Sequence, residues 1–265
     1  MDTTSNRPLA VVTGASSGIG LELAKQFAAH DFDVLVAAED ERIAEVAAGI
    51  AASGVRAEAV RVDLATSAGV DELYSRIEQT GRPVAALALN AGVGAGGAFA
   101  TETSLAEELS LIDLNVRSTV HLAKHVLRDM IARDEGRILF TSSIASTMPG
   151  SFQAVYNASK SLVQSFALAL RDELKDTNVT VTSLMPGPTD TEFFARADML
   201  DTPVGEGDKD DPADVARDGF EAMMNGDERV VSASARTKLQ GRASRFLPDS
   251  AKAAMHRRMA EPKES

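Results

Sequence analysis

Short apolar runs recur along this chain and alternate with longer stretches in which apolar residues return every three or four positions. An unbroken run of about 4–8 apolar residues fits a strand buried on both faces, whereas the longer period fits an amphipathic helix. Their alternation predicts a parallel sheet covered by helices on both faces. The predicted strands span residues 10–13, 34–38, 57–63, 85–90, 137–142, 179–185 and 229–232, and the clearest predicted helices span 41–53, 68–80, 105–133, 155–176 and 251–259.

No repeat and no linker interrupts this pattern. We therefore expect a single-domain α/β fold over residues 1–265, a Rossmann-type doubly wound parallel sheet of about seven strands. Its core is expected at 8–232, and a helical tail at 233–265 is expected to pack on the protein or a partner subunit rather than on a membrane. Apolar side chains beside glycines and charges at 189–211 favour a mobile lid that sets specificity, with an ordinary surface helix and loop as the alternative.

Three glycines, Gly14, Gly18 and Gly20, follow the first predicted strand and lead into a helical pattern. Strand, glycine-rich turn and helix are the context of a dinucleotide fingerprint, in which a pyrophosphate rests on the helix N-terminus. The spacing is Gly-x-x-x-Gly-x-Gly rather than the general Gly-x-Gly-x-x-Gly, and no Gly-Lys-Ser/Thr closes a P-loop. The turn by itself suggests a dinucleotide site without deciding the matter.

Tyr156 and Lys160 stand four residues apart on a predicted helix, and Ser143 precedes the tyrosine in the chain. The spacing places the two side chains on one helix face. Because a neighbouring ammonium favours the phenolate, we expect Lys160 to lower the pKa of Tyr156 from about 10 toward the range useful for acid–base catalysis. The alternative is a helix with a buried tyrosine, an exposed lysine and an unrelated loop serine.

Together the glycine turn and the Tyr156–Lys160 pair resemble the classical short-chain dehydrogenase/reductase family over residues 8–232. The matching motifs fall in the family's order, with one departure: Leu89 stands where the family usually has a second asparagine before Asn90. The resemblance implies that Asn115, Ser143, Tyr156 and Lys160 form the catalytic group. It implies a cofactor site made of Gly14, Ser16, Ser17, Gly18, Ile19, Gly20, Asp63, Leu64, Asn90, Ala91, Gly92, Tyr156, Lys160, Pro186, Gly187, Thr189 and Thr191.

The function that this resemblance implies is an NAD(P)-dependent oxidoreductase that interconverts a ketone and a secondary alcohol. Tyr156 would exchange the proton, Ser143 would orient the substrate oxygen, Lys160 would also bind the nicotinamide ribose, and Asn115 would hold a water. No metal is expected. Two alternatives remain: a dinucleotide sensor without turnover, and a nucleotide-sugar epimerase or dehydratase, whose relatives favour a Gly-x-x-Gly-x-x-Gly loop and longer chains.

NAD is the expected cofactor, with NADP as the alternative. Glu39 ends the second predicted strand, where an acid can accept a hydrogen bond from the ribose 2′-hydroxyl and repels a 2′-phosphate. Ser17 also occupies a position at which NADP-dependent relatives often carry a basic residue. Against this, the family's NAD-type aspartate usually stands at the position of Ala38, and Arg42 lies close enough in the chain to meet a phosphate.

The substrate pocket is expected to be apolar, without a charged anchor. Its candidate lining residues are Val93, Ala145, Met148, Phe152, Phe193, Phe194 and Met199. The long apolar helices predicted at 105–133 and 155–176 have more face than one sheet contact covers. The family pairs these helices across a dimer axis, so we expect at least a homodimer, with a tetramer left open.

Composition and charge restrict the remaining function classes. The formal net charge of −12 argues against nucleic acid or an anionic membrane as the main partner. The chain has no cysteine, and the His121/His125 pair lacks the Glu of a His-Glu-x-x-His zinc motif, so both histidines are predicted to be ordinary helix residues. With no secretory segment and no apolar stretch of about 18 residues, we expect a cytoplasmic protein without stable membrane insertion.

Overall fold

Seven parallel strands form one sheet in the computed structural model of the protein, which describes residues 7–233 and 247–262. The spatial order is β3-β2-β1-β4-β5-β6-β7, so the sheet grows outward in two directions from β1 and β4. This confirms the predicted doubly wound Rossmann-type fold. The strands are β1 (Leu9–Thr13), β2 (Asp33–Ala38), β3 (Ala57–Arg61), β4 (Val84–Leu89), β5 (Gly136–Thr141), β6 (Val179–Pro186) and β7 (Arg229–Ser232).

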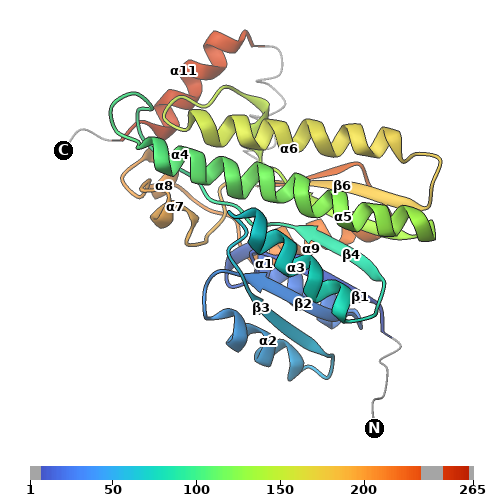
Figure 1. Ribbon diagram of the computed structural model, residues 1–265. Coiled ribbons are helices and arrows are strands. Elements are labelled where there is room, and N and C mark those ends of the chain that lie inside the picture. The colour runs from blue at the N-terminus through green and yellow to red at the C-terminus, as the bar shows by residue number, and fades with distance from the viewer. Residues whose placement is uncertain (1–6, 234–246, 263–265) are drawn as a thin grey trace.

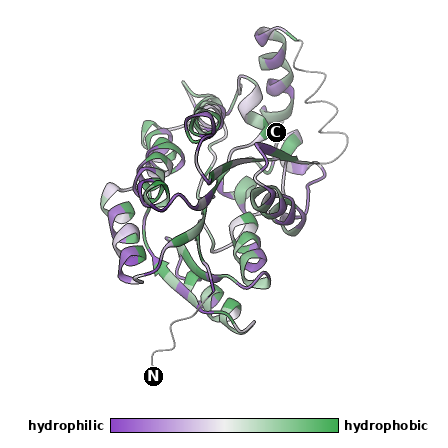
Figure 2. Ribbon diagram, turned by 90° about the vertical axis from the view of Figure 1, so that its right-hand side faces the viewer, coloured by the Kyte–Doolittle hydropathy of each residue, from purple (hydrophilic) through white to green (hydrophobic). Residues whose placement is uncertain are grey.

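Helices cover both faces of the sheet, with their apolar sides turned inward (Figures 1 and 2). The two faces have separate cores because side chains alternate along each strand. In β1, Val11 packs toward α3, α5 and α6, while the next residue, Val12, packs toward α1, α2 and α9. The helices are α1 (Gly18–Ala29), α2 (Ile43–Ala51), α3 (Ser67–Gln79), α4 (Leu105–Ile112), α5 (Ser118–Arg133), α6 (Ala154–Glu173), α7 (Phe193–Arg196), α8 (Pro203–Glu206), α9 (Pro212–Asn225) and α11 (Asp249–Ala260).

The helix predicted at 105–133 differs from expectation. A π-helical turn, Asp113–Arg117, separates α4 from α5 and carries Asn115. Such turns insert a residue into an α-helix and occur mainly at functional sites. The Oγ1 of Thr119 donates to the Asn115 carbonyl at 2.9 Å, which satisfies a main-chain acceptor beside the turn.

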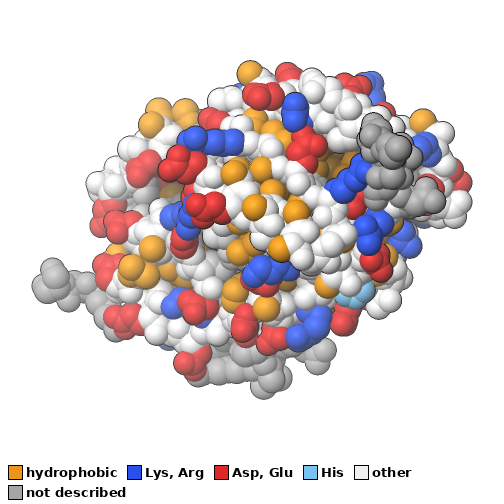
Figure 3. Space-filling view, turned by 90° about the horizontal axis from the view of Figure 1, so that it is seen from below, with side chains coloured by type: hydrophobic (Ala, Val, Ile, Leu, Met, Phe, Trp, Pro, Cys, Tyr) orange, Lys and Arg blue, Asp and Glu red, His pale blue; other side chains and the backbone are white. Residues whose placement is uncertain are grey.

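Positive and negative side chains are interspersed on the face of the molecule seen in Figure 3. Ion pairs are frequent among the charged side chains of the described residues, for example Arg76 with Glu58 at 2.6 Å and Arg217 with Asp214 at 2.7 Å. Among residues 7–233 and 247–262, no helix combines the length and apolar character needed to cross a bilayer.

Candidate active site

A cavity of about 1100 Å³ lies beyond the carboxyl ends of the strands, where the sheet order reverses between β1 and β4. Open α/β sheets bind their ligands at this position. Two of the residues expected at the site, Gly20 and Asn115, stand behind the cavity wall rather than in it. The expected residues that line the cavity are Gly14, Ser16, Ser17, Gly18, Ile19, Glu39, Asp63, Leu64, Asn90, Ala91, Gly92, Ser143, Tyr156, Lys160, Pro186, Gly187, Thr189 and Thr191.

The turn between β1 and α1 requires glycine at each of its three glycine positions. Gly14 and Gly18 have φ angles of +65° and +55°, a backbone region that residues other than glycine rarely adopt. A Cβ at Gly20 would lie 2.2 Å from the Gly14 carbonyl oxygen. Ser17 makes no side-chain cap and the first turn of α1 has no acidic residue, so its N–H groups are left for an anion.

Hydrogen bonds tie together the strand ends that form the cavity floor. The Thr13 hydroxyl accepts from the main-chain N–H groups of Asn90 and Ala91, at 3.0 and 3.1 Å. The Thr141 hydroxyl donates to the Asn90 side-chain oxygen at 3.2 Å. The ends of β1, β4 and β5 are thereby fixed relative to one another at the centre of the site.

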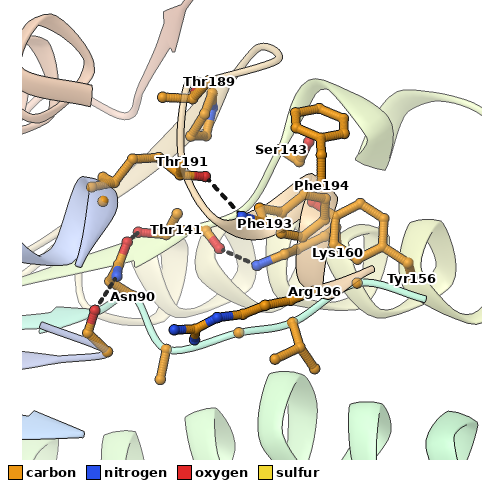
Figure 4. Close-up of a pocket in the computed structure, with 18 of the residues that line it drawn as sticks. Asn90, Thr141, Ser143, Tyr156, Lys160, Thr189, Thr191, Phe193, Phe194 and Arg196 are labelled. Carbon is orange, nitrogen blue, oxygen red and sulfur yellow. Dashed lines mark hydrogen bonds between the residues drawn. The ribbon is translucent and has the colours of Figure 1, made fainter. Parts of the chain in front are cut away.

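Ser143, Tyr156 and Lys160 meet in the middle of the cavity, each at most 9% exposed (Figure 4). Ser143 follows β5, and its hydroxyl lies close enough to the Tyr156 phenol to favour the phenolate. The main-chain N–H of Ala145 donates to the Ser143 oxygen at 3.1 Å, which leaves the Ser143 proton free to point at the tyrosine. The Lys160 ammonium lies 5.9 Å from the centre of the Tyr156 ring and donates to the Thr141 carbonyl at 3.0 Å.

The expected lowering of the Tyr156 pKa is wrong for this structure. Burial raises the pKa of Tyr156 to about 12, because the phenolate loses its hydration, and the nearby Ser143 hydroxyl opposes this only in part. Burial also lowers the pKa of Lys160 to about 8. The ammonium is directed at the Thr141 carbonyl rather than at the phenol oxygen, so desolvation outweighs attraction between the two groups.

Asn115 braces the loop that follows β4. Its side-chain oxygen accepts from the Val93 N–H and its amide donates to the Val93 carbonyl, both at 2.9 Å. The same amide also donates to Ser159 on α6 at 3.1 Å. A Cβ at Gly92 would lie 3.0 Å from the Asn115 oxygen and 3.2 Å from the Lys160 nitrogen, so a side chain there would have to displace both groups by a few tenths of an ångström.

Four charged side chains form a network at the Glu39 end of the cavity that was not predicted from the sequence. The Arg42 guanidinium donates to Glu192 at 2.8 and 3.0 Å and to Asp40, and Arg196 also pairs with Glu192. These bonds hold the pKa of both carboxyls at about 2. Arg42 does not line the cavity, whereas Glu192 and Arg196 do. The network joins the loop after β2 to α7 across 150 residues of sequence.

The opposite end of the cavity is largely apolar. Val93, Ala145, Met148, Phe193 and Phe194 line it as expected, and the Phe193 ring lies 5.2 Å from the Tyr156 ring. Phe152 and Met199 do not line it. Met199 is fully buried against Gln153, whose amide lies 2.9 Å from the Met199 sulfur.

Helix α11 closes this apolar end, a contribution that its short, weakly amphipathic sequence pattern did not predict. It packs on the protein itself, as one of the two predicted placements had it. The Ser151 hydroxyl donates to the Ala253 carbonyl at 3.2 Å, the His256 Nδ1 lies 2.9 Å from the Ser151 carbonyl, and Arg257 lies 5.1 Å over the Phe152 ring. The residues of α11 that line the cavity are Met255, His256, Arg258, Met259 and Ala260, so the wall carries polar groups that were not expected.

The segment predicted as a lid is folded into α7 and α8. A bridge between Thr189 and Asp210 closes its base, with the Asp190 N–H donating to the Asp210 carbonyl at 2.9 Å. The Ala197 carbonyl accepts from the Gly96 N–H at 2.9 Å, which ties α7 to the loop after β4. Its mobility stays a prediction.

Comparison with known proteins identifies relatives of this chain in sequence and in structure. The family model for short chain dehydrogenase matches residues 8–199. An uncharacterized short-chain type dehydrogenase/reductase of Sinorhizobium fredii is 35% identical over 192 residues, 71% of this chain and 73% of the relative. Sulfoacetaldehyde reductase 2 of Chromohalobacter salexigens is 32% identical over 187 residues, 70% of this chain and 74% of the relative. A short-chain dehydrogenase from Sphingobium yanoikuyae in complex with NADPH superposes with a TM-score of 0.80 at 25% identity, covering 97% of each chain.

Proposed function

The chain belongs to the short-chain dehydrogenase/reductase family and is an NAD(P)-dependent oxidoreductase, and on that premise we propose that it interconverts a ketone and a secondary alcohol with Tyr156 as the general acid and base. The observation that carries the proposal is the buried group of Ser143, Tyr156 and Lys160 at the centre of the cavity. A sensor that binds dinucleotide without turnover has no need of these three side chains together, and nothing in the cavity favours it.

The residues present fit a dinucleotide. The uncapped N-terminus of α1 and the Gly14–Gly18 turn can hold the pyrophosphate, and a Cβ at Gly18 would come within 2.9 Å of the Thr191 side chain. Asp63 and Leu64 would flank the adenine, while Pro186, Gly187 and Thr191 would hold the carboxamide of the nicotinamide. When bound, the nicotinamide ring supplies or accepts the hydride.

Tyr156 is poised as an acid in this structure. A phenol with a pKa of about 12 is protonated at neutral pH, so it can donate its proton to a carbonyl oxygen that becomes an alcohol. Ser143 would donate a second hydrogen bond to the same oxygen and keep it in place. Lys160 would stabilise the phenolate left behind. In the alcohol direction the phenolate of Tyr156 takes the hydroxyl proton, which requires a bound state in which its pKa is lower.

The substitution Tyr156→Phe tests this role. We expect kcat to fall by at least about 100-fold, which is the smaller of the rate enhancements typical of a positioned general acid or base. Cofactor binding, measured by calorimetry, should stay unchanged. Substrates would come from a panel of ketones and alcohols assayed with both cofactors. Tyr74→Phe, which changes the other tyrosine of the chain, is the matched control and should keep full activity. A Tyr156→Phe enzyme that retains more than about a tenth of the wild-type kcat would contradict the mechanism.

NAD is the cofactor that we propose to be preferred. Glu39 lines the cavity after β2, where its carboxylate can accept from a ribose hydroxyl. Arg42 is held outside the cavity by Asp40 and Glu192, and Arg196, which lines the cavity, is paired with Glu192. The ratio of kcat/KM for the two cofactors decides this, and a clear preference for NADP would overturn it.

A homodimer is the proposed assembly. Helix α4 exposes Leu105 and Leu109, and α6 exposes Leu162, at 70%, 49% and 44%. Helices α4 and α5 run end to end through the π-turn, and α6 lies beside them (Figure 1). Exposed apolar side chains on adjoining helices are typical of a surface that a second subunit covers.

A further inference from the structure

Two helices outside the cavity bring three metal-binding side chains together. His121 and His125 lie one turn apart on α5, and Asp71 projects from α3, which runs beside α5 (Figure 1). The Nε2 of His121 lies 3.0 Å from the Asp71 Oδ1, and the Nε2 of His125 lies 3.8 Å from the same oxygen. None of the three residues lines the cavity.

We propose that Asp71, His121 and His125 bind a divalent transition-metal ion, with zinc as the first choice. Zinc bonds to imidazole nitrogen at about 2.0–2.1 Å and to carboxylate oxygen at about 2.0–2.2 Å, so tetrahedral ligand atoms lie roughly 3.3–3.5 Å apart. The three candidate ligand atoms all lie within 4.8 Å of one another. The separations of the two histidine nitrogens from the Asp71 oxygen, 3.0 and 3.8 Å, lie just below and just above this tetrahedral spacing. Small side-chain rotations close the remaining difference.

The donor set selects the kind of ion. Two imidazoles and one carboxylate suit zinc and its neighbours in the transition series, whereas magnesium and calcium prefer oxygen ligands. Asp71 is the most exposed of the three side chains, at 60%, so solvent can reach the ion and supply the remaining ligand. Three protein ligands and a water complete a four-coordinate site.

The second histidine, His125, has ring contacts but no hydrogen bond to Asp71. The Asp71 oxygen at 3.0 Å already gives the His121 Nε2 a partner. The His125 nitrogen faces the same oxygen at a distance too long for a hydrogen bond, and the described part of the chain gives its ring no other hydrogen bond. An ion placed between the three groups would use all of them at once.

Packing also holds His125 in a coordinating orientation. The Tyr74 ring stacks on the His125 ring with centres 4.4 Å apart, and the Tyr74 hydroxyl donates to Asp129 at 2.9 Å. Asp129 lies one turn beyond His125 on α5, so the two helices are already linked beside the site. A bound ion would add a clamp between α3 and α5, close in sequence to the π-turn that carries Asn115.

Metal binding to the untagged, full-length protein tests the proposal, since a polyhistidine tag would bind zinc itself. After treatment with EDTA and its removal, calorimetry with zinc chloride should give one ion per chain, and cobalt chloride should give the visible absorption of four-coordinate cobalt. His121→Ala and His125→Ala should each weaken zinc binding by at least about tenfold. Asp71→Asn keeps the shape of the side chain and should weaken it as well.

His30→Ala is the matched control, because His30 lies at the end of α1 on the other face of the sheet, and it should leave the zinc affinity unchanged. Circular dichroism would confirm that each variant is folded. Zinc binding that is equal in wild type and both histidine variants, or absent from the folded wild type, would overturn the proposal. Catalysis enters none of these measurements, so the result is independent of the function proposed above.

Discussion

Individual residues of this site lower the stability of the folded protein. Lys160 is 6% exposed and carries an ammonium whose pKa is lowered to about 8, against an ordinary value of 10.5. In the described part of the chain its ammonium donates one hydrogen bond, to the Thr141 carbonyl. The folded protein therefore keeps a charge in a place where a neutral group would be more favourable.

Lys160→Met should make the protein inactive but more stable. One unit of pKa corresponds to about 1.4 kcal/mol, so removing the buried ammonium should raise the free energy of unfolding by about 1–3 kcal/mol at pH 7, after the lost hydrogen bond is counted. Urea denaturation measures this. Lys25→Met, which removes an exposed lysine, is the control and should change little.

The pH dependence gives a second check on Lys160. Between about pH 8 and 10.5 the unfolded chain binds a proton at this lysine that the folded protein has lost, so wild-type stability gains from rising pH in this window. The advantage of Lys160→Met should therefore shrink between pH 7 and pH 10. An advantage that is constant with pH would show that the ammonium is not the cause.

Glu192 is expected to control cofactor choice through Arg42. Glu192→Gln removes one of the two carboxylates that hold the guanidinium away from the cavity. The ratio of kcat/KM for NADP to that for NAD should then rise by roughly tenfold, the effect of one added charge-assisted contact. The double variant with Arg42→Gln should lose this gain; if it kept the gain, Arg42 would not be the group involved.

At the scale of elements, local pattern predicted the strands well and the irregular parts poorly. The apolar runs around Val11 and Leu87 place β1 and β4 because both strands are buried on both faces. The π-turn at Asn115 leaves the apolar period almost unchanged, so it could not be seen in the sequence. Asp71 meets the histidines of α5 only through folding, and the burial that raises the pKa of Tyr156 depends on all the surrounding elements.

Helix α11 should affect substrate binding far more than cofactor binding. It covers the apolar end of the cavity, and Met259 lines that wall. A chain that ends at residue 246 should show a KM for the ketone raised by roughly tenfold or more. KM rises and kcat stays unchanged when the lost contacts bind the substrate and the transition state equally. The dissociation constant for the cofactor should stay within about twofold.

A point variant guards against misfolding of the shortened chain. Met259→Ala leaves the helix in place, and we expect it to raise the same KM by a smaller factor. Unchanged KM in both proteins, with both folded by circular dichroism, would show that substrate does not reach α11.

At the scale of the whole molecule, the exposed leucines of α4 and α6 offer a surface for a second subunit. Leu109→Glu would place a charge on that surface and should convert a dimer into a monomer of 27.9 kDa in light scattering at micromolar concentration. Leu247→Glu is the matched control, because Leu247 is comparably exposed, at 41%, but lies beside α11. A wild-type protein that is already monomeric would refute the dimer.

The two ends of the cavity are completed at different times during synthesis. The groups proposed to hold the dinucleotide lie between Gly14 and Thr191, so the ribosome makes all of them well before α11. Because the N-terminal part of a chain leaves the ribosome first, the nascent chain holds all of these groups while the substrate end is still missing. A ligand that binds only the folded form stabilises it. Cellular NAD(P) is thus placed to assist the folding of a protein that cannot yet enclose its substrate.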